Sequence, residues 1–183
     1  MITNFLPQLE KVVEIIRSEV PVEMIILFGS TARGEHVSDV TTIGHVTYEY
    51  QSDFDLLVVV KSEKVRDDVE LWDGIKKKIS EDTQIKVPVS LVVDTVNFVS
   101  KKLLEGNYFY SDVKKEGEVL YDSQNFTLPD PRNLSPKKQA DLAQKDFEFW
   151  MTKANDFLKD YEHNMADKSY NNAAFHLSQV TES

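Results

Sequence analysis

MIILFGSTARG (residues 24–34) and QSDFDLLVVV (residues 51–60) are the two segments that decide the fold. Each contains an apolar run short enough to be a buried strand. The first run ends at Gly29-Ser30, a turn where backbone amides can approach a ligand closely. In the second, Asp53 and Asp55 point to the same side because strand side chains alternate. Two neighbouring carboxylates repel each other unless a cation lies between them, and hard oxygen ligands favour Mg²⁺.

FGSTARG (28–34) and SDFDL (52–56) together resemble the nucleotidyltransferase superfamily that includes DNA polymerase β, and more narrowly its small bacterial members. Gly-Ser or Asp-x-Asp alone is common in turns, so the specificity comes from the pair of motifs. The resemblance implies an α/β (α+β) nucleotidyltransferase fold with a mixed sheet, followed by a separate helical segment.

The resemblance also implies roles for individual residues. Asp53 and Asp55 would be catalytic and would bind Mg²⁺, whereas Gly29, Ser30 and Arg33 would contact the phosphates of an NTP, with ATP favoured. An arginine in such a turn can equally be a surface residue. The implied reaction transfers a nucleoside monophosphate to a hydroxyl of a small molecule or a protein, and pyrophosphate leaves.

A third carboxylate on a neighbouring strand, acting as metal ligand or base, is a further expectation from the resemblance. By strand position Ser90 falls where that acid is expected. Asp94 shares its face under strict alternation but lies four residues on, about 13 Å further along a strand. The third acid is therefore open between these two positions. The alternative function is a weakly active or inactive nucleotide-binding module in an antitoxin or regulatory role.

Hydrophobic periodicity predicts the elements around this stretch. Segment 35–51 departs from the family pattern, and its β-branched and aromatic alternation predicts an extra hairpin. His36 and His45 in this segment lack zinc spacing, so we interpret them as solvated. Thr95 is the predicted cap of a helix that ends at Gly106. The remaining predictions are helices over 5–20, 64–80, 96–105 and 107–113, and strands over 24–28, 87–94 and 117–122.

The C-terminal part predicts a second domain. A Pro-rich linker over 129–135 separates a nucleotidyltransferase domain over 1–128 from a helical segment over 136–183. Ser135-Pro136 predicts the first helix start, and a second helix is expected near Ser169. The order is similar to bacterial fusions of a nucleotidyltransferase with a HEPN domain, here incomplete, and implies a toxin–antitoxin-like partner or self-association. No Arg-to-His ribonuclease motif of such domains is found.

Composition narrows the other classes. The net charge of −10 disfavours long nucleic acid, because binding to a phosphate backbone needs clustered Lys and Arg. The chain has no cysteine, so disulfides and thiolate metal sites are excluded. No apolar run approaches the ~20 residues of a membrane span, and no secretory signal is recognisable, so we expect no membrane and a cytoplasmic protein.

Overall fold

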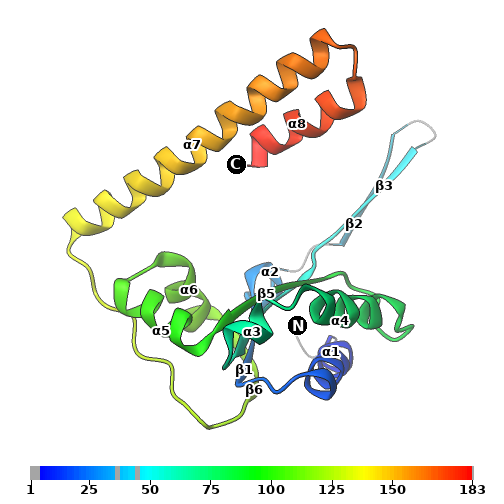
Figure 1. The fold of residues 1–183 in the computed structure, drawn as a ribbon. Coiled ribbons are helices and arrows are strands. Elements are labelled where there is room, and N and C mark those ends of the chain that lie inside the picture. Colours follow the sequence, from blue (N-terminus) through cyan, green and yellow to red (C-terminus); the bar gives the residue numbers. More distant parts are fainter. Residues whose placement is uncertain (1–4, 36–37, 44–45, 183) are drawn as a thin grey trace. The chain divides into compact units, whose positions relative to one another are not determined.

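The computed structural model describes residues 5–35, 38–43 and 46–182 (Figure 1). The chain divides into two compact units, an N-terminal unit over Met1–Arg132 and a helical unit over Asn133–Ser183. This division falls inside the segment that the sequence predicts as a linker. Within the described ranges, no helix combines the length and the apolar character that crossing a membrane requires.

A four-stranded sheet forms the centre of the N-terminal unit, with the strand order β5-β4-β1-β6. Strand β1 runs antiparallel to both of its neighbours, whereas β4 and β5 run parallel. The predicted mixed sheet is therefore confirmed. The strands are β1 Met24–Phe28, β4 Phe54–Val60, β5 Val89–Thr95 and β6 Glu118–Asp122.

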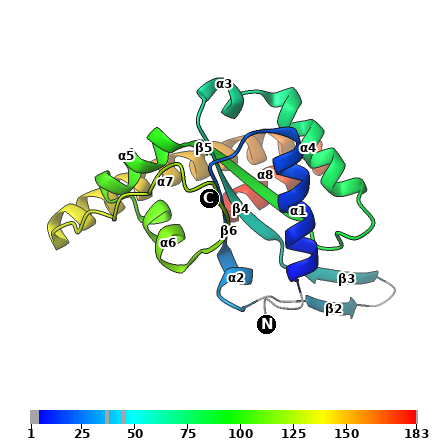
Figure 2. The ribbon, with the colours of Figure 1, turned by 90° about the horizontal axis from the view of Figure 1, so that it is seen from below.

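Helices cover both faces of this sheet (Figure 2). One face packs against α1 (Leu6–Glu19) and α4 (Val69–Glu81), and the other against α5 (Val96–Glu105) and α6 (Tyr108–Glu116). Strand β4 is buried almost throughout, because its alternate side chains enter both cores. The first core includes Leu9, Val12, Ile16, Phe54, Trp72 and Ile75, and the second includes Leu57, Val59, Val99, Leu103 and Val113.

The single helix predicted over 64–80 is wrong, because this segment forms two helices, α3 (Glu63–Arg66) and α4. The helical conformation is interrupted before α4. There Asp68 has an extended backbone, and its carboxylate accepts a hydrogen bond from the Leu71 backbone amide at 3.1 Å. This N-cap stabilises a new helix start. The indole of Trp72 in α4 donates a hydrogen bond to the Val65 carbonyl of α3 at 2.8 Å, which links the two helices.

The boundaries around α5 follow the sequence. The Thr95 hydroxyl accepts a hydrogen bond from the Phe98 amide at 3.2 Å, and Gly106 ends the helix with φ 74°. Both predicted caps are confirmed.

Strand β5 begins two residues later than predicted, after Pro88, which has no N–H to donate. The Pro88 carbonyl instead accepts from the Phe54 amide at 2.8 Å.

The predicted extra hairpin is present as a separate antiparallel pair of strands, β2 (Ser38–Ile43) and β3 (Val46–Gln51). Its backbone register pairs Ser38 with Gln51 and Ile43 with Val46. The prediction of solvated histidines at His36 and His45 lies outside the described residues.

The helical unit consists of α7 (Pro136–Ala166) and α8 (Tyr170–Glu182), which pack against each other. Helix α7 begins as predicted, with the Ser135 hydroxyl accepting from the Lys138 amide at 3.4 Å. In the described part of this unit, only Ala173 is a buried hydrophobic residue. Many large apolar side chains stay exposed, namely Phe147, Phe149, Trp150, Met151, Tyr170, Phe175 and Leu177. The two helices alone therefore do not enclose a core.

A buried carboxylate joins the start of β1 to the chain that follows β6. Glu23 is 7% exposed. It accepts hydrogen bonds from the Ser123 hydroxyl at 2.5 Å and from the side-chain amide of Asn125 at 3.1 Å. The ammonium nitrogen of Lys61 lies 3.4 Å from Oε1 of Glu23. The hydrogen bond from Ser123, helped by Asn125 and Lys61, lowers the pKa of Glu23 despite its burial.

Glu23→Gln is expected to lower the free energy of unfolding at pH 7 by about 1.5–3 kcal/mol, because hydrogen bonds to a charged group are lost. Folding lowers the pKa of Glu23, so its contribution is present above the ordinary carboxyl pKa of about 4.3. The contribution is lost as the pH falls through the lowered folded value. Urea unfolding at pH 7 and at low pH measures this difference.

The matched control is Glu14→Gln. Its side chain is 69% exposed and pairs with Lys11 on the surface, so the loss is expected to stay below about 1 kcal/mol. Equal losses for the two variants at pH 7, or a Glu23→Gln loss that does not shrink at low pH, contradict this role for Glu23.

Candidate active site

The first predicted motif forms the end of β1 and the short helix α2 (Gly29–Ala32). The chain leaves β1 at Gly29 with φ 75°, a left-handed conformation that favours glycine. A Cβ atom at this position would overlap Oδ2 of Asp55. A residue without a side chain is therefore what allows the turn and the Asp55 carboxylate to lie in contact.

Strand register brings the second motif to the same place. Asp55 stands opposite Phe28 of β1 and opposite Ser90 of β5. Residues opposite each other on neighbouring strands share one face of the sheet. Asp53 lies just before β4, and its Oδ2 accepts a hydrogen bond from the Ser90 hydroxyl at 2.6 Å. Asp53, Asp55, Gly29 and Ser90 thus form one cluster, which we call the carboxylate cluster.

The carboxylate cluster concentrates negative charge in a half-buried place. Burial raises the pKa of Asp55, and the neighbouring charge of Asp53 raises it further. In the described part of the chain, no cationic side chain contacts either carboxylate. The cluster therefore favours a bound cation, which would relieve the repulsion between its two carboxylates.

Asp94 lies elsewhere on β5. It stands opposite Val59, four register positions from Ser90, and its Oδ2 accepts a hydrogen bond from the Tyr110 hydroxyl at 2.6 Å. Burial raises the pKa of Asp94, while the Tyr110 hydrogen bond and Arg66 oppose this rise. Burial and the same hydrogen bond raise the pKa of Tyr110. The structure thus brings Ser90, but not Asp94, to the other two aspartates.

A third acidic ligand is absent from the described part of the cluster. Among the described residues, no three Asp, Glu, His or Cys side chains gather closely enough to hold a metal ion by themselves. Two carboxylates and the Ser90 hydroxyl are the oxygen donors that the chain brings together. Further oxygen ligands would have to come from a substrate or from water.

Ser30 and Arg33, the other predicted phosphate ligands, belong to the turn after β1. Ser30 is the second residue of α2 and is partly exposed. The Arg33 guanidinium pairs with Glu35, with Nε 3.0 Å from Oε2, and its side chain is 47% exposed. A pocket of about 220 Å³ lies against Gly29 and Arg33, and α6 forms its other wall.

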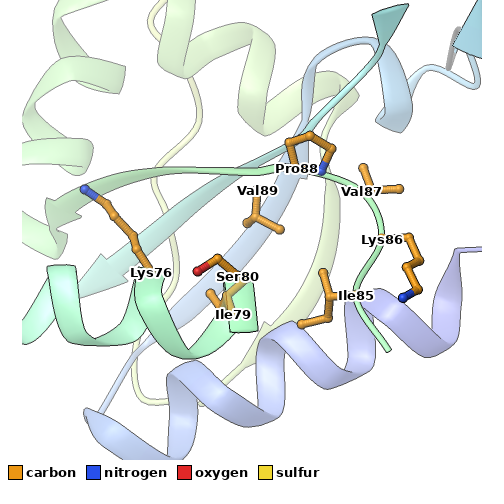
Figure 3. A pocket seen from close by; sticks show the side chains of 8 residues that line it. All are labelled: Lys76, Ile79, Ser80, Ile85, Lys86, Val87, Pro88 and Val89. Atoms are coloured by element: carbon orange, nitrogen blue, oxygen red, sulfur yellow. The ribbon is translucent and has the colours of Figure 1, made fainter. Parts of the chain in front are cut away.

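A second pocket, of about 260 Å³, contains none of the predicted site residues. It is lined by the end of α4 and the chain entering β5 (Figure 3). Lys76 and Lys86 contribute positive charge, but no carboxylate lines it. This pocket has no ligand set for a divalent cation, so we assign the candidate active site to the carboxylate cluster.

Sequence reasoning missed Thr31, which is 2% exposed. Its hydroxyl donates to the backbone carbonyl of Asp53 at 3.0 Å and so joins α2 to the residue before β4. Tyr110 was missed as well. A threonine beside a Gly-Ser turn is a weak signal for such a contact, because Ser and Thr hydroxyls in turns often bond to the nearby backbone instead.

Comparison with known proteins identifies the family. Residues 10–126 match the family described as "Polymerase beta, Nucleotidyltransferase", which is more than half of the chain. No curated protein matches the chain significantly. A solved structure described as "Crystal structure of the toxin-antitoxin with AMP-PNP" matches with 15% identity and a TM-score of 0.39, covering 88% of this chain and 98% of that one. That likeness is too distant to support a functional assignment. On the family match, the chain belongs to the polymerase-beta-type nucleotidyltransferases.

Proposed function

We propose that the chain transfers a nucleoside monophosphate from an NTP, with ATP favoured, to a hydroxyl of a small molecule or a protein. The observation that carries this proposal is the contact between the Gly29 turn and Asp55, with Asp53 beside it. A family match supports the reaction class, and the site supplies the residues.

The donor set fits Mg²⁺. Asp53 and Asp55 are hard oxygen ligands, and burial together with the charge of Asp53 raises the pKa of Asp55. These two side chains would hold the ion, with remaining ligands from phosphates and water. When bound, Mg²⁺ supplies neutralisation of the phosphate charge that develops during transfer.

The turn after β1 would orient the NTP. Backbone amides near Gly29 and the Ser30 hydroxyl are the groups that can donate to phosphate oxygens. Arg33 can join them once it leaves Glu35, and this costs little because exposed ion pairs contribute about 0–1 kcal/mol. The acceptor hydroxyl then attacks the α-phosphorus, its oxygen forms the new bond, and the bond to pyrophosphate breaks. The acceptor proton passes to a carboxylate or to water.

A weaker second candidate is a nucleotide-binding module with low or no turnover, in an antitoxin or regulatory pairing. Two observations favour it: the described part of the site has no third acid, and the helical unit leaves large apolar side chains exposed. This candidate includes our proposal that α7 and α8 belong to a HEPN-like domain.

Incubation with α-labelled ATP, GTP, CTP or UTP and Mg²⁺, over a panel of hydroxyl acceptors that includes proteins, separates the two candidates. The enzyme is expected to give a labelled product and to release pyrophosphate. Nucleotide binding without label transfer to any acceptor favours the module, and absence of both rejects the proposal that this site handles nucleotides.

The exposed apolar side chains of the helical unit are expected to form an interface, because large apolar patches on a protein surface usually mark interaction sites. We expect self-association, seen as a mass in sedimentation equilibrium that rises with concentration. Trp150→Glu, on a side chain that is 45% exposed, should return the protein to a monomer. Gln139→Glu, also exposed on α7, adds the same single negative charge and is the control. A wild-type monomer at all concentrations contradicts self-association.

A further inference from the structure

We propose that Ser90 limits the carboxylate cluster to a single divalent cation and holds Asp53 in place to bind it. This inference rests on the proposed function, because it concerns the cation that would accompany the nucleotide. It assigns to Ser90 a positioning role that acts through Asp53.

The position of Ser90 follows from the sheet. In the parallel register of β4 and β5, Ser90 stands opposite Asp55, and its hydroxyl donates to Asp53 at 2.6 Å. Ser90 therefore contacts one carboxylate and lies beside the other. A side chain at this position can decide how many negative charges meet there.

Asp53 precedes β4, so no pairing with a neighbouring strand fixes its position. It therefore needs side-chain contacts to hold it. Two hydroxyls from different elements hold it. Thr31 of α2 donates to its backbone carbonyl at 3.0 Å, and Ser90 of β5 donates to its carboxylate. Since a serine hydroxyl donates one proton, Ser90 fixes one oxygen of Asp53 and leaves the other free for a cation.

The charge of the site then sets the number of cations. Two-metal sites place the ions about 3.5–4 Å apart, where two divalent charges repel strongly unless bridging carboxylates offset them. Besides the phosphates of the nucleotide, Asp53 and Asp55 supply two negative charges to this site, and Ser90 supplies none. Asp94 is engaged by Tyr110 at another place on β5, and the described residues offer no further acid to the cluster.

Counting bound Mn²⁺ tests this inference without measuring turnover. Mn²⁺ replaces Mg²⁺ and is counted by electron paramagnetic resonance, with the α,β-methylene analogue of ATP at saturation, because that analogue cannot undergo transfer. The wild-type chain is expected to bind one Mn²⁺ per bound nucleotide. The Ser90→Asp variant is expected to bind two Mn²⁺. The Ser90→Asn variant, whose side chain has the shape of aspartate without its charge, is expected to bind one.

The outcomes separate this inference from the proposed function. Two Mn²⁺ per nucleotide in the wild type overturn the role of Ser90 and leave the proposed function standing. One Mn²⁺ in a folded Ser90→Asp variant also overturns it. A wild-type chain that binds neither the nucleotide nor Mn²⁺ rejects the proposed function, and this inference with it. The wild-type count decides the matter even if Ser90→Asp does not fold.

Discussion

Gly29→Ala is expected to lower nucleotide transfer by about 10²-fold, because displacement of a reacting group by about 1 Å costs that much. The new Cβ would overlap Oδ2 of Asp55, so the carboxylate and the turn must move apart. The left-handed backbone at Gly29 adds strain of about 1–2 kcal/mol to the folded state. Transfer assays and thermal unfolding measure the two effects separately.

Gly34→Ala is the matched control for this variant. Gly34 has the same φ of 75°, but no atom lies within 4 Å of the place that its Cβ would take. Both variants should lose similar stability, and Gly29→Ala alone should lose transfer. Equal transfer by the two variants would show that contact between the turn and Asp55 is not needed.

The double variant Asp53→Asn, Asp55→Asn is expected to abolish Mg²⁺-dependent nucleotide binding and leave the fold intact. The amides keep the shape of the side chains but remove both negative charges that would hold the cation. Burial and the repulsion from Asp53 both raise the pKa of Asp55, so removing the two charges should keep the variant at least as stable as the wild type. Calorimetry with the α,β-methylene analogue of ATP, with and without Mg²⁺, measures the binding.

Asp94→Asn is the control for removing a carboxylate from the same sheet. Asp94 accepts from Tyr110 away from the carboxylate cluster, so this variant should bind the nucleotide with unchanged affinity. Unchanged affinity in the folded double variant rejects the metal-binding role of Asp53 and Asp55. If Asp94→Asn instead abolishes a high wild-type transfer activity, Asp94 supplies the base that the cluster lacks, and the site is fully active rather than weakly active.

Much of the fold could be predicted from the sequence, because short stretches of neighbouring residues determine many of its helices and strands. The apolar runs of β1 and β4, the Thr95 cap and the Gly106 stop each depend on residues close together in the chain. The break before α4 was missed because Val65, Trp72 and Ile75 keep helical spacing across it, whereas the Asp68 cap interrupts the backbone. Hydrophobic periodicity reports which face is buried and is insensitive to such a cap.

The site divides in the same way. The contact of Gly29 with Asp55 and the cluster around Asp53 come from motifs that the sequence displays. The Thr31 hydrogen bond to Asp53 and the Tyr110 hydrogen bond to Asp94 join residues that no sequence motif pairs. Only the packing of α2 and α6 against the sheet brings these pairs together, and no spacing rule gives that packing.

The position of a radioactive label tests most directly whether this chain transfers a nucleoside monophosphate. Parallel reactions with Mg²⁺ contain ATP labelled either at the α-phosphate or at the γ-phosphate. Nucleotidyl transfer predicts that α-label enters the acceptor product and γ-label leaves in pyrophosphate, with both signals lost in the Asp53→Asn, Asp55→Asn variant. Transfer of γ-label to the acceptor, or α-label transfer that persists in the double variant, would contradict it.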